Sequence, residues 1–525
     1  MLAIERALAS LADSERPLLE IFDDAAEVSA VYSYRQTTRA AMALGRYLAS
    51  LTRSLDRPAV VGVVCGNTAE FVVADLACIL SRFIEVPVPL AFSRVQAGNL
   101  LAGIDLCLHD RQGATKLVEW GSGALPGGIP TVLLDLSALL HDGEDLPFAL
   151  PPVAGDWICK TIHTSGTTSH PKGVKIRALG LDALLGSLMA EMPADAFRRY
   201  LSTVPMSLLI EQVTGLYMVV LQGGTLSLLP ASSPLIGTTP AAGAQTMRFL
   251  ARAKATALVA TPALVEEIER TATALRAAGA AINQTLFGTD DLPLICCGGA
   301  PISLEVLRSL DALGIPVYEG YGLSENSSVV AWNRPNARKL GTVGRPLPHV
   351  RLMLGDDGEV LVKSTSLFDG YTVDDPSSCA IDDDGWLHTG DLGSVDAEGF
   401  LRITGRRKNV IITTTGRNVA PEWVEAQYAT LAFVRAVAVA GNHLESLHGL
   451  FLVDPAYDLD EARVRIDAFG ESHLSDVERV RVAYVLPAKD SDYRRFFTVT
   501  GRPMRVILDR AIAEGTIPQP SLSRA

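Results

Sequence analysis

Residues 161–174 read Thr161-Ile-His-Thr-Ser-Gly-Thr-Thr-Ser-His-Pro-Lys-Gly-Val174. Glycine and small hydroxyl residues let a loop turn its backbone N–H groups toward an anion, and the hydroxyls add further donors. Lys172 adds a positive charge to the same stretch. The G-x-x-x-x-G-K-[ST] spacing of a Walker-type loop is absent. From composition alone, the stretch is either a phosphate-binding loop or a polar surface turn.

Strand-like and helix-like segments alternate on both sides of this loop. Residues 59–65 form a short continuous apolar run, typical of a strand buried on both faces, and the helix-like residues 69–80 follow it. Residues 257–261 and 262–272 repeat this pattern, and residues 293–297 add another apolar run. Such alternation predicts an α/β fold with mixed or largely parallel sheets and flanking helices.

The character of the chain changes near residues 405–409. Shorter elements follow, including a helix-like segment at 421–431 and strand-like segments at 436–440 and 480–486. About 115 residues remain after this point, enough for a small α+β domain. We expect a large N-terminal domain, a hinge and a small mobile C-terminal domain over residues 1–405, 406–409 and 410–525.

Composition restricts the class of protein. The chain is 48% hydrophobic and 20% charged, which is ordinary for a globular protein with a large core. Its net charge of -13 argues against nucleic acid as a partner, because binding to a phosphate backbone relies on a basic surface. The seven cysteines show no C-x-x-C spacing, which indicates buried free thiols. No signal peptide and no apolar run of roughly 18 residues is found, so we expect a cytoplasmic protein without a transmembrane segment.

The opening stretch resembles the phosphate-binding loop T-S-G-T-T-G-x-P-K-G of the adenylate-forming superfamily. This superfamily holds acyl-CoA synthetases, peptide-synthetase adenylation domains and luciferases. Ser169 stands where the family normally has a glycine. The resemblance implies that ATP phosphates are bound here, with Lys172 as a catalytic cation. The other loop residues assigned to ATP are Thr164, Ser165, Gly166, Thr167 and Thr168.

Two further motifs follow in the family's order. Residues 298–301 resemble the adenine-binding turn, and residues 318–325 resemble the segment whose aromatic residue packs on adenine and whose serine contacts the α-phosphate. In that segment the resemblance assigns Mg²⁺ to Glu325, and a carboxylate suits this hard, oxygen-seeking cation. Taken alone, Glu325 would be a solvated surface acid. The nucleotide-binding residues implied are Gly298, Gly299, Ala300, Tyr321, Gly322 and Ser324.

A third motif, at residues 385–391, resembles the family's ribose site. The Asp391 carboxylate can accept hydrogen bonds from both ribose hydroxyls at once. Residues 405–408 resemble the interdomain hinge, with Arg406 as a catalytic residue near the nucleotide and Lys408 at the pivot. In the family the small domain rotates about this hinge between adenylation and thioester formation.

A run at residues 416–425 completes the hinge motif. In the family it lines the path of the incoming thiol arm, where a glycine, here Gly416, permits close approach. The resemblance extends from about Ser33 to Arg505, and so many motifs in the expected order make coincidence untenable.

The acyl-binding region departs from the family pattern. In residues 204–211 Leu208 occupies the position of a gating histidine, so gating is steric or altered. The segment also lacks the aspartate that holds a substrate ammonium in many amino-acid-activating relatives. That disfavours an α-amino acid, although Glu211 leaves the alternative open. The apolar run at 216–221 and the run at 416–425, which resembles long-chain fatty acyl relatives, favour a fatty or aryl acid.

The second departure lies near the C-terminus. The family's catalytic lysine sits in a T-x-x-G-K-x-x-R setting, and the matching run from Thr498 to Arg505 carries Arg502 at the lysine position. Arginine keeps the charge but is planar and larger. We assign Arg502 as the catalytic cation. A solvated arginine in a degenerate tail is the alternative.

These resemblances imply ATP-dependent activation of a carboxylic acid to acyl-AMP with release of pyrophosphate. The acyl group then passes to a thiol of CoA or a phosphopantetheinyl carrier. The chain contains no Gly-x-Asp-Ser carrier motif, so any acyl or peptidyl carrier protein is expected to be separate. Two alternatives remain open: an adenylate-binding protein with little or no catalysis, which Arg502 favours, and transfer of the acyl group to an amine or oxygen acceptor.

Overall fold

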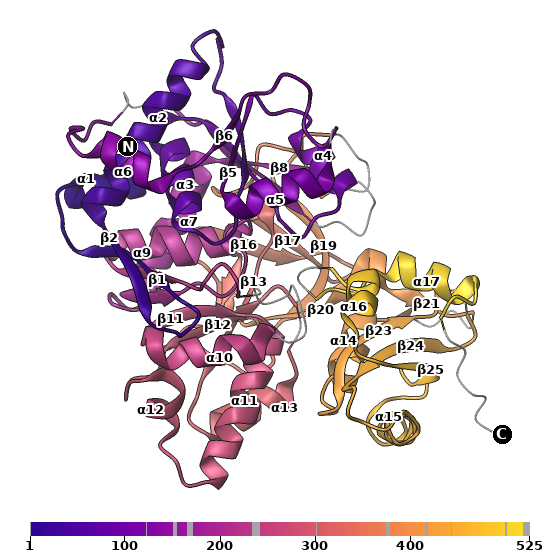
Figure 1. The fold of residues 1–525 in the computed structure, drawn as a ribbon. Coiled ribbons are helices and arrows are strands. Elements are labelled where there is room, and N and C mark those ends of the chain that lie inside the picture. The colour runs from indigo at the N-terminus through magenta and orange to yellow at the C-terminus, as the bar shows by residue number, and fades with distance from the viewer. Residues whose placement is uncertain are drawn as a thin grey trace.

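The computed structural model shows two units joined near residue 406 (Figure 1). The larger unit contains the N-terminus, and the smaller unit, coloured orange to yellow, contains the C-terminal elements. The residues that the structure describes are 2–121, 123–150, 155–164, 172–233, 242–300, 302–373, 379–414, 418–442, 444–498 and 501–517.

The largest sheet has nine strands and crosses the centre of the larger unit. In chain order they are β1 (Pro17–Phe22), β2 (Val28–Ser33), β9 (Arg199–Leu201), β10 (Thr225–Leu228), β11 (Ala257–Ala260), β12 (Leu294–Gly298), β13 (Val317–Tyr321), β14 (Ala331–Trp332) and β15 (Arg345–Pro346). Their order in the sheet is β15-β14-β13-β12-β11-β9-β10-β1-β2. From β13 to β1 the strands are parallel, and antiparallel pairs close both edges. The carboxyl ends of β12 and β13 therefore lie side by side.

A second sheet of six strands carries the phosphate-loop stretch. Its strands are β3 (Val60–Val64), β4 (Ile84–Pro87), β5 (Leu106–His109), β6 (Thr131–Leu133), β7 (Ile158–Thr164) and β8 (Lys172–Arg177). Their order is β6-β5-β3-β4-β7-β8. All neighbours are parallel except β7 and β8, which form an antiparallel pair in which Thr164 lies opposite Lys172. The stretch thus joins two strands, not a strand and a helix.

A third, antiparallel sheet leads into the smaller unit. Its strands are β16 (Val350–Leu354), β17 (Glu359–Ser364), β18 (Ala380–Ile381), β19 (Leu387–Val395) and β20 (Leu401–Arg406). Strand β19 pairs with β17, β18 and β20, and Asp391 lies opposite Arg406 in the β19–β20 register. The 3₁₀ turn η3 (Arg407–Asn409) follows β20 directly.

Helices flank these sheets, as the alternating pattern predicts. They are α1 (Ala3–Leu11), α2 (Tyr34–Leu51), α3 (Ala69–Ser81), α4 (Arg94–Leu101), α5 (Arg111–Trp120), α6 (Leu136–Gly143), α7 (Ala178–Glu191), α8 (Leu209–Glu211), α9 (Met218–Leu221), α10 (Ala242–Ala253), α11 (Pro262–Ala277), α12 (Ile282–Phe287) and α13 (Leu304–Ala312). The π-helix η1 (Gln212–Tyr217) joins α8 to α9, and η2 (Ser324–Asn326) is a 3₁₀ turn. Helix α2 begins where Ser33 and Gln36 form a capping box.

The smaller unit is an α+β structure with its own hydrophobic clusters. It contains β21 (Ile411–Ile412), β22 (Asn418–Val419), α14 (Pro421–Tyr428), β23 (Val434–Ala440), β24 (Leu447–Val453), α15 (Leu459–His473), β25 (Val480–Pro487), α16 (Asp490–Phe496) and α17 (Arg505–Ala513). Two clusters of buried apolar side chains lie within residues 411–517 and include no residue of the larger unit. This separation supports the domain boundary that the sequence predicts, which stays a prediction.

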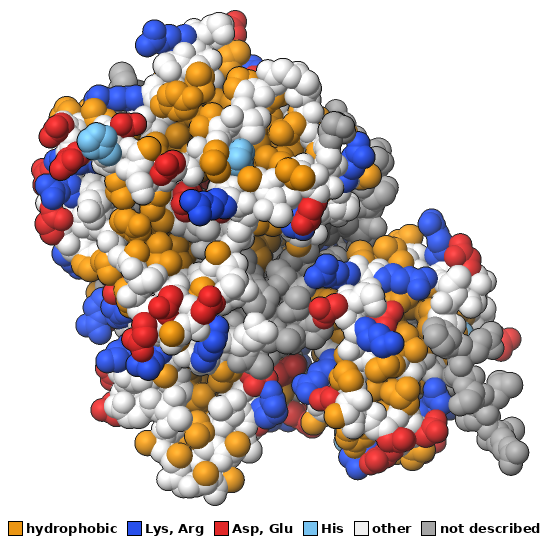
Figure 2. All heavy atoms as spheres, viewed as in Figure 1, with side chains coloured by type: hydrophobic (Ala, Val, Ile, Leu, Met, Phe, Trp, Pro, Cys, Tyr) orange, Lys and Arg blue, Asp and Glu red, His pale blue; other side chains and the backbone are white. Residues whose placement is uncertain are grey.

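The expectation of an α/β unit followed by an α+β unit is confirmed. Six cysteines are buried and Cys379 is partly buried, and all seven carry free thiols. No helix in the described part of the chain is long and apolar enough to cross a membrane. Lys, Arg, Asp and Glu side chains are interspersed over the face of both units shown in Figure 2.

Candidate active site

A cavity of about 670 Å³ opens in the larger unit and extends to residues 406–408 and to Arg502 of the smaller unit. It brings together residues that are far apart in the sequence and that the motifs singled out separately. The predicted site residues on its wall are Gly298, Gly299, Tyr321, Gly322, Ser324, Glu325, Arg406, Lys408 and Arg502. Asp391 is not on the wall, but Thr389 and Gly390 before it are.

The predicted adenine turn lies at the carboxyl ends of β12 and β13. Gly298 ends β12, and Ala300 follows after Gly299, whose φ of +84° favours glycine. Gly322 follows β13, where a Cβ atom would lie 1.6 Å from the carbonyl oxygen of Ser328. Both glycines therefore meet a backbone requirement at the switch from strand to loop, where ligands commonly bind in α/β folds.

Tyr321, Asp391 and Arg406 form a buried polar group beside this turn. The Tyr321 hydroxyl donates to Asp391 Oδ2 at 2.7 Å, and Arg406 Nε donates to Oδ1 at 2.6 Å. Burial, and then the Asp391 charge, raise the pKa of Tyr321 well above its usual range. Burial lowers the pKa of Arg406, but the charge and hydrogen bond of Asp391 raise it above its ordinary value overall. The carboxylate predicted to bind ribose is thus held in place by the two residues predicted to contact the nucleotide.

Glu325 sits in the turn η2 and is 7% exposed. The Tyr371 hydroxyl donates to Glu325 Oε1 at 2.7 Å. Burial, and then the Glu325 charge, raise the pKa of Tyr371. Tyr371 lies in a segment that pairs with β8: Tyr371 bridges to Val174, and Thr372 exchanges hydrogen bonds with Gly173. The Glu325 carboxylate is therefore tied to the strand that leaves the phosphate-loop stretch.

Arg502 extends from the smaller unit into the cavity. Its Nε donates to the carbonyl oxygen of Gly299 at 2.8 Å, across a separation of 203 residues. Its backbone is fixed by Thr498, whose N–H donates to the Arg502 carbonyl and whose hydroxyl accepts from the Arg502 N–H. Burial and the nearby Arg406 charge lower the pKa of Arg502. The guanidinium therefore contacts the larger unit, and its role as the catalytic cation stays a prediction.

Arg505, three positions further on, has a different environment. Its guanidinium pairs with Glu425 at 2.6 Å and with Glu422 at 3.4 Å, all within the smaller unit. It does not line the cavity. Of Arg502 and Arg505, only Arg502 lines the cavity.

Glu359, His388 and Arg407 line the cavity near residue 406, whereas the part of the wall around Leu208 is apolar. Leu208, at the position of the family's gating histidine, lies on this wall with its neighbours Leu209 and Ile210. His163 also lines the cavity, and burial lowers its pKa to about 4, so it is neutral at pH 7. Other apolar residues on the wall are Phe92, Ile162, Val204, Val259, Leu323, Val329 and Trp332.

Two expectations about the acyl site are corrected by the structure. Glu211 is fully buried and accepts hydrogen bonds from Tyr200 at 2.7 Å and Ser202 at 2.6 Å. It is not among the cavity residues, so it is not placed to hold a substrate ammonium. The apolar run at 216–221 packs in the core of the larger unit and does not line the cavity. Its hydrophobicity therefore reflects burial in the fold.

Several predicted residues lie at the limits of the structure or beyond them. Thr164 ends β7 and Lys172 begins β8. The remaining predicted loop residues, Ser165, Gly166, Thr167 and Thr168, and the predicted tunnel residue Gly416 fall outside the described residues. Lys408 is exposed in η3, and Asn409 beside it donates to Glu422 at 2.7 Å.

Sequence reasoning missed Tyr371, Glu359 and Arg407, although all are near the predicted site. Tyr371 contacts Glu325, whereas Glu359 and Arg407 contact each other at 2.8 Å beside the hinge. Arg407 lies between two residues that the motif did identify. For Glu359 the sequence offers only the Asp-Asp-Gly turn before it, because its partners come from other strands.

The profile of the AMP-binding enzyme family matches residues 18–372. The chain belongs to the AMP-binding enzyme family. The matched region contains the phosphate-loop stretch, the adenine turn and Glu325, whereas Asp391, Arg406 and Arg502 lie beyond it.

Curated relatives and solved structures resemble the chain to different extents. The chain is 42% identical over 158 residues to a long-chain-fatty-acid–CoA ligase, FadD15, of Mycobacterium bovis, covering 30% of this chain and 26% of that relative. It is 27% identical over 488 residues to long-chain-fatty-acid–CoA ligase 6 of Mus musculus, covering 81% and 69%. The chain thus spans about a quarter of FadD15 in that match.

Among solved structures, the fold resembles the anthranilate CoA ligase AuaEII in complex with anthranoyl-AMP. The TM-score is 0.79 at 19% identity, covering 98% of each chain. It also resembles the O-succinylbenzoate CoA synthetase MenE of Bacillus subtilis in complex with AMP, with a TM-score of 0.72 at 21% identity, covering 96% of this chain and 98% of that one. At these identities the likeness establishes a shared two-unit fold.

Proposed function

We propose that this AMP-binding enzyme activates an apolar carboxylic acid with ATP as an acyl-AMP, releases pyrophosphate, and transfers the acyl group to a thiol of CoA or a carrier protein. The observation that carries the proposal is the contact of Arg502 with Gly299. It brings a cation from the smaller unit to the adenine turn, inside the cavity that Glu325 and Arg406 also line.

This arrangement suits acyl-AMP formation. A carboxylate and the α-phosphate of ATP are both anions, and they repel each other until positive charge lies between them. Arginine can bridge carboxylate and phosphate oxygens with paired hydrogen bonds. Positive groups aimed at developing phosphoryl charge are a recurring source of rate enhancement. Arg502 and Arg406 are among the cations on this wall, together with Arg407 and Lys408.

Glu325 fits the Mg²⁺ ion that such a reaction needs. It is a largely buried carboxylate on the cavity wall, oriented by the Tyr371 hydroxyl. No group of three or more His, Cys, Asp or Glu side chains among the described residues is arranged to hold a metal ion. A single carboxylate is enough for Mg²⁺, which commonly completes its shell with phosphate oxygens and water. When bound, the ion would neutralise charge on the phosphates.

The substrate class follows from the apolar part of the wall. A fatty or aryl chain can be buried against Leu208, Val259 and Trp332, and none of these side chains could pair with an α-ammonium group. The names of the relatives, which refer to long-chain fatty acids, anthranilate and O-succinylbenzoate, support this class.

The proposal is tested by trapping activated acids with hydroxylamine across a panel of fatty, aryl and amino acids, with pyrophosphate release measured in parallel. We expect hydroxamates from apolar acids and none from amino acids. CoA and a phosphopantetheinyl carrier are then compared as acceptors, with amines and alcohols as the alternative. A protein that binds ATP but releases no pyrophosphate with any acid would instead be an adenylate-binding protein without catalysis.

A further inference from the structure

Glu359 is a buried carboxylate beside the nucleotide end of the cavity. It begins β17, directly after the turn that contains Asp357, and its side chain is only 4% exposed. It also lines the cavity wall. Burying a carboxylate is costly unless charged or hydrogen-bonding partners compensate it. The groups that contact the Glu359 carboxylate therefore indicate its structural role.

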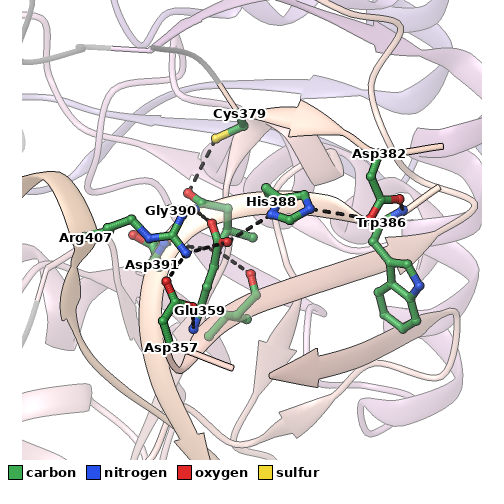
Figure 3. Close-up of polar contacts among 11 residues, drawn as sticks. Asp357, Glu359, Cys379, Asp382, Trp386, His388, Gly390, Asp391 and Arg407 are labelled. Carbon is green, nitrogen blue, oxygen red and sulfur yellow. Dashed lines mark hydrogen bonds and ion pairs between the residues drawn. The ribbon is translucent and has the colours of Figure 1, made fainter. Parts of the chain in front are cut away.

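Three donors converge on Glu359, as Figure 3 shows. The Gly390 N–H donates to Oε1 at 2.8 Å, and Arg407 Nη2 donates to Oε2 at 2.8 Å. His388 Nδ1 lies 3.0 Å from Oε2. Arg407 also contacts Asp357, and His388 Nε2 lies 3.4 Å from Asp382. The hydrogen bond to Glu359 is the main reason that the pKa of His388 is raised.

The register of the sheet places these contacts next to the predicted ribose-binding residue. Asp391 and Arg406 lie opposite each other in β19 and β20. Gly390 immediately precedes Asp391, and Arg407 immediately follows Arg406. The Glu359 carboxylate thus contacts the residues next to Asp391 and Arg406. It accepts a hydrogen bond from the backbone of β19 at Gly390 and another from the side chain of Arg407, which follows β20.

We propose that Glu359 is a positioning residue that orients Asp391 for the ribose and, through Arg407, locks the hinge in the orientation seen here. The inference rests on the proposed function. The lock must open for the small domain to rotate, because a hinge concentrates its backbone change in a few residues and Arg407 is one of them. Arg407 and Asp357 are about half exposed, at 49% and 55%, so their ion pair is weak and the contact with buried Glu359 dominates.

The contacts of Glu359 with Gly390 and with Arg407 can be separated by mutation. Glu359→Gln keeps the shape of the side chain but removes its charge, and it weakens both of these contacts. Arg407→Ala removes only the hinge contact. Asp356→Asn is the control, because Asp356 is exposed in the same turn and no described contact joins it to Gly390 or Arg407.

Three measurements distinguish the variants, and none of them needs turnover. Hydrogen–deuterium exchange of the peptide that contains Gly390 reports the β19 contact. Fluorescence energy transfer between dyes on introduced cysteines, Ala280→Cys on the larger unit and Val464→Cys on the smaller, reports the hinge. The dissociation constant for ATP with Mg²⁺, measured without acid, reports the ribose site.

We expect Glu359→Gln to increase Gly390 exchange and to weaken ATP binding about tenfold, since a charged hydrogen bond is lost. Its KM for ATP should rise while kcat for acyl-AMP formation changes little. We expect Arg407→Ala to leave Gly390 exchange and ATP affinity near those of the wild type but to add a second distance population between the dyes.

Two outcomes would overturn the inference. Glu359→Gln with the exchange and ATP affinity of Asp356→Asn would exclude a positioning role, and a single unchanged distance distribution in Arg407→Ala would exclude the lock. If the wild-type protein binds no ATP and activates no acid, the proposed function fails, whereas exchange and distance still report on the contacts themselves.

Discussion

Arg502 and Arg505 show how residues of one type, three positions apart, acquire different roles. Arg502 contacts the predicted adenine turn, whereas Arg505 forms ion pairs with two glutamates of its own unit. Because a guanidinium can bridge carboxylate and phosphate oxygens, arginine can replace the lysine that the family pattern has at position 502. Whether arginine can perform the role of the family's lysine is therefore tested at Arg502 alone.

We expect Arg502→Ala to slow acyl-AMP formation by on the order of 10²-fold, because a preorganised positive contact with the transition state is lost. Supplied with preformed acyl-AMP, the variant should transfer the acyl group at nearly the wild-type rate. Arg502→Lys should retain much activity. Arg510→Ala, exposed on α17, is the matched control. Normal adenylation by Arg502→Ala, measured as pyrophosphate release, would remove Arg502 from the catalytic set.

Glu211 tests how the burial of a carboxyl group makes the stability of the protein depend on pH. Burial raises its pKa to about 7, despite donors that favour the charged form. Between pH 4.5 and 7 the unfolded chain loses this proton before the folded chain does. The group's contribution to stability is therefore largest at low pH and decreases as the pH rises toward 7.

Glu211→Gln should abolish this pH dependence, so the variant should gain stability relative to the wild type as the pH rises from 5 to about 7.5, by up to about 3 kcal/mol. Thermal unfolding across this range measures the gain. Glu514→Gln, exposed near the C-terminus, should show no such trend. A stability difference independent of pH would mean that Glu211 is charged in the folded state throughout.

At the scale of elements, one buried lysine joins four segments of the larger unit. Lys160 of β7 pairs with Asp75 of α3 at 2.6 Å and with Glu85 of β4, and all three side chains have zero exposure. Tyr217 of η1 donates to Asp75 at 2.8 Å. Burial, and then the Asp75 charge, raise the pKa of Glu85 to about 8. Such a network fixes how α3, β4, β7 and η1 pack, because each partner would be left unpaired by a shift of the others.

We expect Lys160→Met to destabilise the larger unit by about 3–5 kcal/mol, since two buried carboxylates lose their common cation. Lys116→Met makes the same change in the exposed Lys116–Glu119 pair of α5 and should cost about 1 kcal/mol or less. Urea unfolding of both variants gives the comparison. Equal losses would show that the network contributes nothing beyond a surface pair.

At the scale of the whole molecule, Arg502 crosses from the smaller unit to the larger one to contact Gly299. This orientation is the one that adenylation requires in the proposed function. Transfer to a thiol then requires the smaller unit to turn about residues 406–409, because the thiol must reach the same acyl group. Lys408 is the middle residue of the 3₁₀ turn η3. The φ typical of a 3₁₀ turn is near the value that proline imposes.

Lys408→Pro should therefore preserve acyl-AMP formation and slow thioester formation at least about tenfold, because proline fixes φ and the hinge can no longer change it. Lys408→Ala should keep both half-reactions. Each half-reaction is measured separately, by pyrophosphate release and by transfer from preformed acyl-AMP. Equal loss of both in the proline variant would speak against a hinge at this position.

The sequence by itself determined the types of the elements, and its motifs predicted the nucleotide-site residues. Helix α3 at Ala69–Ser81 and strand β12 at Leu294–Gly298 lie within a residue of the segments that hydrophobic periodicity predicts. Gly299 and Gly322 were predicted from the resemblance of their motifs, and the structure shows that each meets a local backbone requirement. Such information is carried by residue identity and short-range spacing.

Only the tertiary structure decided which side chains face one another across long separations. The Glu211 side chain accepts hydrogen bonds from Tyr200 and Ser202 and does not face the cavity. The run at 216–221 packs in the hydrophobic core and does not form the acyl pocket. Glu359 meets Arg407, 48 residues away, through the pairing of β17, β19 and β20. These outcomes depend on sheet register and packing, and a single sequence does not specify which buried carboxylate meets which cation, because any pairing that satisfies their charges is locally equivalent.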